Sequence, residues 1–306
     1  MNNPSIEHQK MVIEINKAID DLPSLPSAVS KLMALSISDS HYFDIVQEVA
    51  EQDPTFAVRL LKVANSAANA SISEITSISH AVARIGTRHI KELILAFAVA
   101  KIFIPRNDSE RNLWVHSIQV AVASQTIARI SSHLGIKPEE AYLCGLLHDI
   151  GRFVLFNKFP EGPIRIDEKD WESPEKLLEV EKEVCGINHA TLGAYAAKKW
   201  GLPHEVTNVI SNHHSYDYLT LTPAEIKESK LVQIVQMSDF LSVLLMKNPD
   251  ILVSSPEEIQ GLIESRCIHY SWEEAPITSF LLQGEVQNIF DSSSEIVNNL
   301  GLGSSE

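Results

Sequence analysis

Residues 146–151 read Leu146-Leu147-His148-Asp149-Ile150-Gly151 and place two titratable side chains inside an apolar pattern. The pattern extends to both sides and predicts a helix from about Pro138 to Phe156. A carboxylate without a partner in such a helix would cost several kcal/mol. Neighbouring helical residues point in different directions, yet an imidazole and a carboxylate can still reach one ion. We therefore interpret His148 and Asp149 as a pair of metal ligands.

The same conflict between pattern and polarity recurs further along the chain. Asp239 lies in a predicted helix from about Lys230 to Lys247, and its helical neighbours are apolar. It too needs a buried partner. Imidazoles that could join these carboxylates lie on other predicted helices, at His116, His189, His213 and His214. So many histidines favour iron, manganese, nickel or zinc over cations that prefer oxygen ligands alone.

Each of these residues also has an ordinary explanation. A single histidine on a helix is usually a core or surface residue, and an isolated aspartate commonly pairs with arginine. His213 and His214 stand at a predicted helix end, where they interact favourably with the helix dipole without any metal. A structure in which the histidines are scattered and bind nothing therefore stays open. The metal hypothesis depends on the number and order of the residues.

Helix signals continue outward from this stretch and predict an all-α fold. Asn-Gly and Asp-Gly, the usual hairpin dipeptides, are absent from the sequence. Asp53-Pro54 opens a helix that Asn65-Ser66 ends, and Thr87 caps an apolar segment from His89 to Phe103. Residues 158–175, rich in Pro, Glu and Asp, are expected to form a long surface loop. Further helices are expected near residues 113–130, 190–200, 204–213, 257–265 and 277–290.

Composition limits the classes of function. The chain has 306 residues, of which 44% are hydrophobic, so it is long and apolar enough for a globular core. Its net charge of −15 repels phosphate backbones and anionic lipids, so we expect no nucleic-acid partner and no membrane association. Three cysteines without a CxxC pair, and no signal or membrane-spanning segment, favour the cytoplasm.

The order of the titratable residues resembles a known signature. The chain resembles the H…HD…D pattern of the HD superfamily of metal-dependent phosphohydrolases through His116, then His148-Asp149, then Asp239. The additional histidines His189, His213 and His214 look like those of the HD-GYP branch of this superfamily. Roughly residues 20 to 215 resemble the HDOD family more closely. The matching segments are Leu22-Pro23-Ser24-Leu25-Pro26, Asp53-Pro54, Leu60-Leu61-Lys62-Val63-Ala64-Asn65-Ser66, Ala81-Val82-Ala83-Arg84-Ile85-Gly86, Gly145-Leu146-Leu147-His148-Asp149-Ile150-Gly151 and Trp200-Gly201-Leu202-Pro203.

The HDOD resemblance implies an all-helical fold used in bacterial signal transduction, generally without demonstrated hydrolysis. It implies an N-terminal helical lobe, residues 1–105, packed on an HD-like lobe, residues 106–215. Residues 216–306 would then be a C-terminal helical extension that completes the HD-like core with Asp239 and ends in a disordered tail.

Departures from the enzymatic relatives bear on catalysis. The GYP element is missing after Gly151. Arg152 stands where HD-GYP proteins usually carry a lysine, and an arginine there could still bind an anion. Asn112 occupies the position of the glutamate that holds a third metal in some HD-GYP proteins, so we expect one or two divalent ions (Fe, Mn, Ni or Zn).

Two functions are compatible with this resemblance. The preferred one is a signalling output module that retains the metal site and engages a signalling protein or a small phosphorylated ligand. The alternative is a metal-dependent phosphohydrolase acting on a nucleotide or cyclic dinucleotide phosphoester. In that enzyme, His116, His148 and Asp239 would hold one ion together with Asp149. Asp149 would bridge this ion to a second one, which His189, His213 and His214 would hold. Arg152 would neutralise the phosphoryl oxygens in the enzyme. The oligomeric state is left open.

Overall fold

The regular elements of the chain are helices throughout the part that the structure describes. The computed structural model describes residues 17, 20–22, 27–35, 39, 41–52, 54–65, 75–86, 90, 93–94, 98, 101–169, 173–216 and 223–302. Within these ranges no β strand occurs, which confirms the all-α prediction. The expected roles of Pro23 to Pro26, Asp53 and Thr87, and most of the segment from His89 to Phe103, lie outside the described residues.

The chain divides into two compact units, and the smaller one holds the first helices. This unit comprises Pro23–Arg106 and Ser294–Glu306. Its helices are α2 (Ser27–Ala34), α3 (Tyr42–Gln52), α4 (Pro54–Ala64) and α5 (Ile78–Ile85). They pack in chain order, α2 on α3, α3 on α4 and α4 on α5. The three-part division with boundaries at residues 105 and 215 stays a prediction.

The helix break expected at Asn65 is present, and the asparagine side chain anchors the segment that leads into α5. Helix α4 ends at Ala64. The Asn65 amide nitrogen donates to the carbonyl oxygens of Leu61 and Ile75, at 2.9 and 2.8 Å, and its oxygen accepts from the Ile75 backbone nitrogen at 2.8 Å. One side chain therefore joins the end of α4 to the residues just before α5.

Replacing this side chain should destabilise the smaller unit. We expect Asn65→Ala to lower the free energy of unfolding by about 1–3 kcal/mol, because the buried Ile75 segment loses its hydrogen-bond partners. Asn65→Asp keeps the acceptor and loses the donor, so it should fall between Asn65→Ala and wild type. Urea unfolding followed by circular dichroism measures the effect. Equal midpoints for wild type and Asn65→Ala would contradict it.

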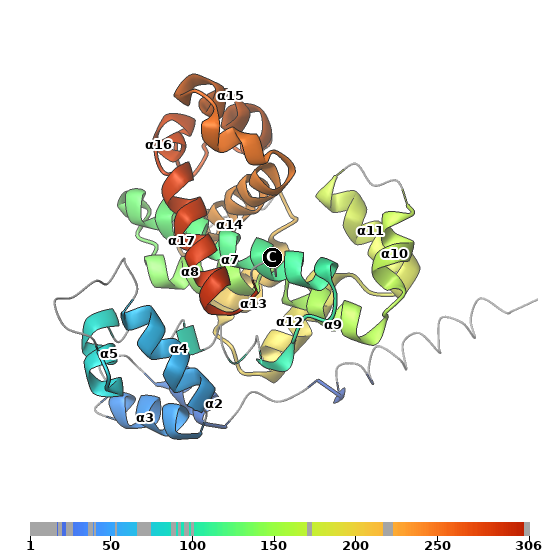
Figure 1. Cartoon of the computed structure of the whole chain (residues 1–306). Helices are drawn as coiled ribbons and strands as arrows, with labels where there is room; N and C mark the ends of the chain where they lie inside the picture. The colour runs from blue at the N-terminus through green and yellow to red at the C-terminus, as the bar shows by residue number, and fades with distance from the viewer. Residues whose placement is uncertain are drawn as a thin grey trace, which may run out of the picture. The chain divides into compact units, whose positions relative to one another are not determined.

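The larger unit comprises Met1–Leu22 and Asn107–Ser293 and carries most of the helices. Figure 1 shows them in green to red. They are α7 (Asp108–Ile130), η2 (Ser132–Leu134), α8 (Pro138–Leu147), α9 (Ile150–Lys158), α10 (Gly162–Asp167), α11 (Pro174–Cys185), α12 (His189–Lys199), α13 (His204–Asn212), α14 (Pro223–Lys247), η3 (Pro249–Val253), α15 (Pro256–Arg266) and α16 (Ser279–Gln283). Helix α17 (Val286–Asn299) is divided between the two units.

Two groups of helices in the larger unit frame its core. Helix α7 packs against α8 and α14, while α12 packs against α9 and α13. Helix α13 also contacts α8 and α14, so the two groups are joined. Helix α7 is buried on most of its surface, as expected for a helix with neighbours on several sides. Helices α10 and α11 lie side by side (Figure 1).

The predicted helix from Pro138 to Phe156 is wrong at its centre, where the structure has two helices. Helix α8 ends at Leu147 and α9 begins at Ile150. The His148 ring donates from Nδ1 to the carbonyl oxygen of Gly145 at 2.7 Å, and Asp149 departs from helical geometry with ψ of 14°. The residues on both sides of the turn are apolar, so hydrophobic periodicity does not reveal the break.

Other helix boundaries also differ from expectation. The predicted loop over residues 158–175 contains α10 and overlaps the last residue of α9 and the first two of α11, so that prediction is wrong for residues 158, 162–167 and 174–175. Helix α14 begins at Pro223 and not near Lys230. The helix expected over residues 277–290 is interrupted around Gly284, between α16 and α17. Pro, Gly and charged residues at these points are compatible with helix ends as well as with loops.

One helix among the described residues, Glu225–Lys247 within α14, is long and apolar enough to cross a membrane. However, 72% of its apolar window is buried inside the structure. A core helix meets the same criteria of length and composition, so this is weak evidence for a span. The cysteines Cys144, Cys185 and Cys267 are all free and buried, in keeping with packing roles.

Candidate metal centre

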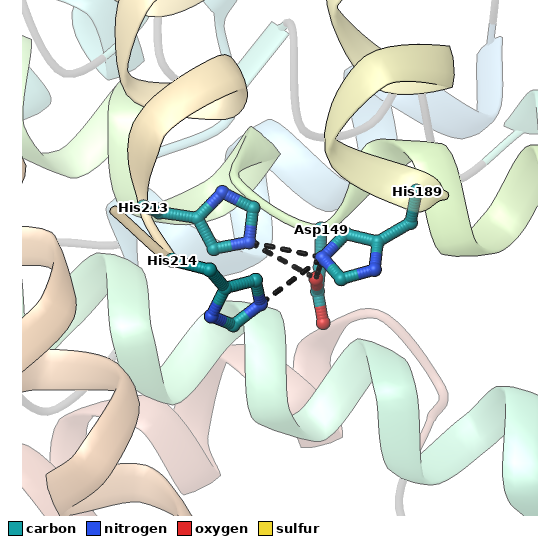
Figure 2. Close-up of side chains that lie close together, drawn as sticks. All are labelled: Asp149, His189, His213 and His214. Carbon is teal, nitrogen blue, oxygen red and sulfur yellow. Dashed lines mark hydrogen bonds and ion pairs between the residues drawn. The ribbon is translucent and has the colours of Figure 1, made fainter. Parts of the chain in front are cut away.

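All seven candidate ligands lie together in the larger unit, in two groups of buried side chains. The His189 cluster consists of Asp149, His189, His213 and His214 (Figure 2). The His116 cluster consists of His116, His148 and Asp239. Within each cluster the potential ligand atoms lie within 4.8 Å of one another. The residues come from positions spread over more than a hundred residues of sequence, yet folding brings them to one place.

The His189 cluster is built at the ends of two helices. His189 is the first residue of α12, while His213 and His214 come directly after α13. The Nε2 atom of His189 lies 3.1 Å from Nε2 of both His213 and His214, and 3.2 Å from Oδ1 of Asp149. Figure 2 shows the three rings and the carboxylate turned toward one another. Two imidazole nitrogens, from His189 and His213, thus lie within 3.6 Å of Oδ1 of Asp149, and the nitrogen of His214 adjoins that of His189.

The His116 cluster is built mainly from helix interiors. His116 lies in α7 and Asp239 lies in α14, two helices that pack against each other. The Nε2 atom of His116 is 3.3 Å from Nε2 of His148 and 3.3 Å from Oδ1 of Asp239. The polar positions that interrupt the apolar patterns of these helices therefore face one another.

Asp149 joins the two clusters through its two oxygens. Oδ1 faces the His189 cluster, at 3.2 Å from His189 and 3.6 Å from His213. Oδ2 faces the other cluster, at 3.8 Å from His148 and 3.9 Å from His116. The side chain is 4% exposed. The turn between α8 and α9 makes this possible, because it brings the aspartate out of regular helical direction. One carboxylate thus has the geometry to bridge two ions.

Hydrogen bonds on the outer side of the rings set their orientation. The Nδ1 atom of His148 donates to Gly145 O at 2.7 Å, and that of His213 donates to Ile210 O at 2.9 Å. His116 places Nδ1 at 2.9 Å from the hydroxyl oxygen of Ser242. That hydroxyl donates to Gln119 Oε1, so its oxygen accepts from the ring. In each case the neutral ring keeps a lone pair on Nε2, facing inward.

The charges around the site maintain ligand-competent protonation states. Burial opposes ionisation of Asp149, but His148, His189 and Arg152 hold the pKa of its carboxyl well below the usual range. Burial lowers the pKa of His148 to about 4. Burial also lowers the pKa of His214 well below its ordinary value, with further effects from His213 and His189. Near neutral pH, Asp149 is therefore anionic and His148 and His214 are neutral, which are the forms that bind metal.

This donor set fits a divalent transition metal. The inward lone pairs of His189 and His213 meet at 3.1 Å, and those of His116 and His148 meet at 3.3 Å. Without a proton or a cation between them, these pairs repel one another in a buried environment. Five imidazoles and two carboxylates match the preference of zinc, iron, manganese or nickel for mixed nitrogen and oxygen ligands. The identity and number of ions stay a prediction.

Arg152 lies at the edge of the centre. Its Nη1 is 3.4 Å from Oδ2 of Asp149, its guanidinium lies over the ring of Phe156, and its side chain is 26% exposed. It is thus far more accessible than any of the seven candidate ligands, all of which are buried. An anion that approached Asp149 from solvent could therefore bind the partly exposed guanidinium of Arg152.

A residue that the sequence analysis missed completes the surroundings of His189. Glu181 in α11 is fully buried, and its Oε2 lies 2.6 Å from Nδ1 of His189. Burial opposes ionisation of Glu181, but the neighbouring His189 lowers the pKa of its carboxyl below the usual value. Burial also opposes protonation of His189, but Glu181 and Asp149 raise the pKa of its ring above the usual value. The sequence contained a signal for this buried glutamate, because Leu177, Val180 and Cys185 lie at helical spacing on the same buried face as Glu181.

Comparisons with known proteins agree with this architecture. The sequence model of the HDOD domain family matches residues 22–216. A Treponema pallidum protein of uncharacterized function is 29% identical over 207 residues, which are 67% of this chain and 40% of that protein. Ribonuclease Y of Mycoplasma capricolum is 32% identical over 137 residues, 45% of this chain and 19% of the enzyme. The chain thus spans less than half the length of these relatives.

Solved structures share the fold. An HDOD domain protein of unknown function from Geobacter sulfurreducens aligns with a TM-score of 0.68 at 22% identity, over 97% of this chain and 99% of that one. A Marinobacter aquaeolei protein provisionally assigned to signal transduction aligns with a TM-score of 0.69 at 18% identity, over 96% and 66% of the two chains. A Shewanella amazonensis protein provisionally assigned as a phosphohydrolase gives 0.64 at 23% identity, over 94% and 96%.

Proposed function

Because the chain belongs to the HDOD domain family, we propose that it is a bacterial signal-transduction protein whose HD-type centre holds two divalent transition-metal ions. The observation that carries the proposal is the position of Asp149, whose two oxygens face two separate groups of histidines. His116, His148 and Asp239 would hold one ion, and His189, His213 and His214 would hold the other. This assignment keeps the ligand order of the HD superfamily.

In the signalling function, the metal centre would stabilise the folded larger unit. Its ligands come from α7, α12, α14 and the segments next to α8 and α13, so bound ions would tie together helices that are distant in sequence. A surface of the stabilised unit would engage a signalling protein or a small phosphorylated ligand in the cytoplasm. The burial of all seven ligands, each under 9% exposed, favours this use over free access of a large substrate.

A second candidate is hydrolysis of a nucleotide or cyclic dinucleotide phosphoester, and the position of Arg152 favours it. The guanidinium contacts the bridging carboxylate and is partly exposed, so it could bind a phosphoryl oxygen beside the centre. Two divalent ions held by the seven candidate ligands would supply activation of a water molecule and stabilisation of negative charge. Asp149 and the five histidines would orient that chemistry.

One experiment separates the two candidates. In the native bacterium we expect His148→Ala to produce the same change in gene expression as deletion of the gene, because a ligand of the centre is lost. The purified metal-loaded wild type is expected to show no turnover of bis-p-nitrophenyl phosphate, nucleotides or cyclic dinucleotides. Turnover that disappears in His148→Ala would favour the enzyme, and a normal expression pattern in His148→Ala would contradict the signalling role of the centre.

Removing the metal should destabilise the wild-type protein. Metal that binds only the folded state stabilises it by mass action, so saturating EDTA should lower the melting temperature of protein as purified. Added zinc should restore the original value after the chelator is removed. Differential scanning calorimetry measures both steps, with Lys169→Ala as a control for a change at an exposed residue outside the ligand set. A melting temperature that stays the same after addition of EDTA and after addition of zinc would argue against bound ions.

A further inference from the structure

Glu181 is a buried carboxylate outside the predicted ligand set, and its hydrogen bonds to described residues all go to His189. Its side chain has no exposed surface. Its Oε2 accepts from the backbone nitrogen of His189 at 2.8 Å and faces the ring Nδ1 at 2.6 Å. The two groups stand eight positions apart in sequence and belong to different helices, α11 and α12. Such a short contact to a charged acceptor is strong and directional.

His189 lacks the local backbone partner that His148 and His213 have. His148 and His213 bond Nδ1 to the carbonyl three residues earlier, at the end of their own helical segment. His189 is the first residue of α12, so no preceding helical turn supplies such a carbonyl. The orientation of its ring therefore depends on a side chain from elsewhere in the fold.

The buried charge of Glu181 also raises the pKa of Arg152, but no hydrogen bond joins these two side chains among the described residues. The other oxygen of Glu181, Oε1, has no hydrogen-bond partner there, and the same holds for the nearby Nε of Arg152. Arg152 instead contacts Asp149. Burying a carboxylate is costly, and a hydrophobic residue of similar size would often be as stable or more so. Among the described residues, His189 is thus the hydrogen-bond partner that accounts for a glutamate at this position.

We infer that Glu181 is a positioning residue, which holds the ring of His189 with Nε2 directed into the His189 cluster. The inference rests on the proposed metal centre and deepens it. By donating Nδ1–H to a carboxylate, the ring presents a more electron-rich Nε2 to a cation. Helix α11 thereby becomes part of the centre, although it supplies no direct ligand.

Substitutions at Glu181 test this with zinc as the probe. In Glu181→Leu we expect zinc affinity of the full chain to fall roughly 10–100-fold, the usual cost of losing an outer partner. Glu181→Gln keeps an acceptor without the charge and should recover part of the loss. Isothermal titration calorimetry measures the affinities, and thermal unfolding measures stability in the absence of metal. Glu183→Gln is the matched control, since Glu183 is on the same helix, is 65% exposed and pairs with Lys169.

A positioning role predicts that affinity falls while metal-free stability is kept or rises. Unchanged zinc affinity in Glu181→Leu would overturn the inference, and so would an equal loss in Glu183→Gln. Nitrogen-15 histidine NMR of metal-free protein gives an independent readout, in which the Hδ1 signal of His189, identified by its absence in His189→Gln, disappears in Glu181→Leu. If wild type binds no zinc, the metal proposal fails, and the NMR signal alone decides: its persistence in Glu181→Leu would overturn the positioning role.

Discussion

Asp149→Asn is expected to abolish tight binding of both ions, because one oxygen of Asp149 faces the His189 cluster and the other faces the His116 cluster. Oδ1 lies 3.2 Å from Nε2 of His189, and Oδ2 lies 3.8 Å from Nε2 of His148. Asparagine has nearly the same shape but no charge, so it cannot offset the positive charge of two cations and of Arg152. We expect zinc affinity to fall by more than the roughly 100-fold that an outer partner can cost.

The matched control is Asp239→Asn, which changes one carboxylate in the His116 cluster alone. It should remove one equivalent of zinc and leave the His189 cluster able to bind the other. Plasma mass spectrometry of dialysed protein counts the ions, and titration calorimetry gives their affinities. If Asp149→Asn held two equivalents as tightly as wild type, the bridging role would be wrong.

Gly151→Ala is expected to disturb both stability and the metal centre. A Cβ atom at this position would lie 2.7 Å from the backbone nitrogen of Gly193 and would overlap the carbonyl oxygen of His189. These are backbone atoms of α12, so they cannot rotate away, and α9 and α12 must separate. Such overpacking costs typically about 1–3 kcal/mol. Because His189 itself is displaced, zinc affinity should fall as well.

Gly261→Ala is a matched control for this change. It lies in α15, and nothing would stand within 4 Å of the added Cβ. Alanine in a helix is generally favoured over glycine by about 0.5–1 kcal/mol. Thermal unfolding should thus show a lower midpoint for Gly151→Ala and an unchanged or higher midpoint for Gly261→Ala. A Gly151→Ala protein that melts and binds zinc like wild type would show that α9 and α12 do not approach so closely.

Much of the centre could be predicted from sequence because its residues violate the helical pattern. Asp149 and Asp239 stand among apolar residues, and a buried carboxylate needs a partner wherever the chain folds. The order of the histidines and aspartates then suggested which groups meet. The structure brings all seven candidates together, although the binding of metal stays a prediction.

The turn at His148 could not be predicted in the same way, and the apolar face around Glu181 indicates a buried glutamate without naming its partner. Apolar residues flank the turn on both sides, so the pattern looked like one continuous helix. At this turn the structure has a hydrogen bond from the His148 ring to the Gly145 carbonyl oxygen, a contact that hydrophobic periodicity does not reveal. Glu181 comes after a segment rich in Pro, Glu and Asp, which resembled a surface loop, and its partner lies on the next helix. Tertiary contacts of this kind leave little trace in local sequence.

The most direct test of a two-ion centre is a crystal structure of the protein grown with manganese, with anomalous scattering recorded to locate the metal. Two peaks about 3.5–4 Å apart are expected, both in contact with Asp149. One should lie among His116, His148 and Asp239, and the other among His189, His213 and His214. A crystal structure of the folded protein with no anomalous peak between these side chains would contradict the proposed centre.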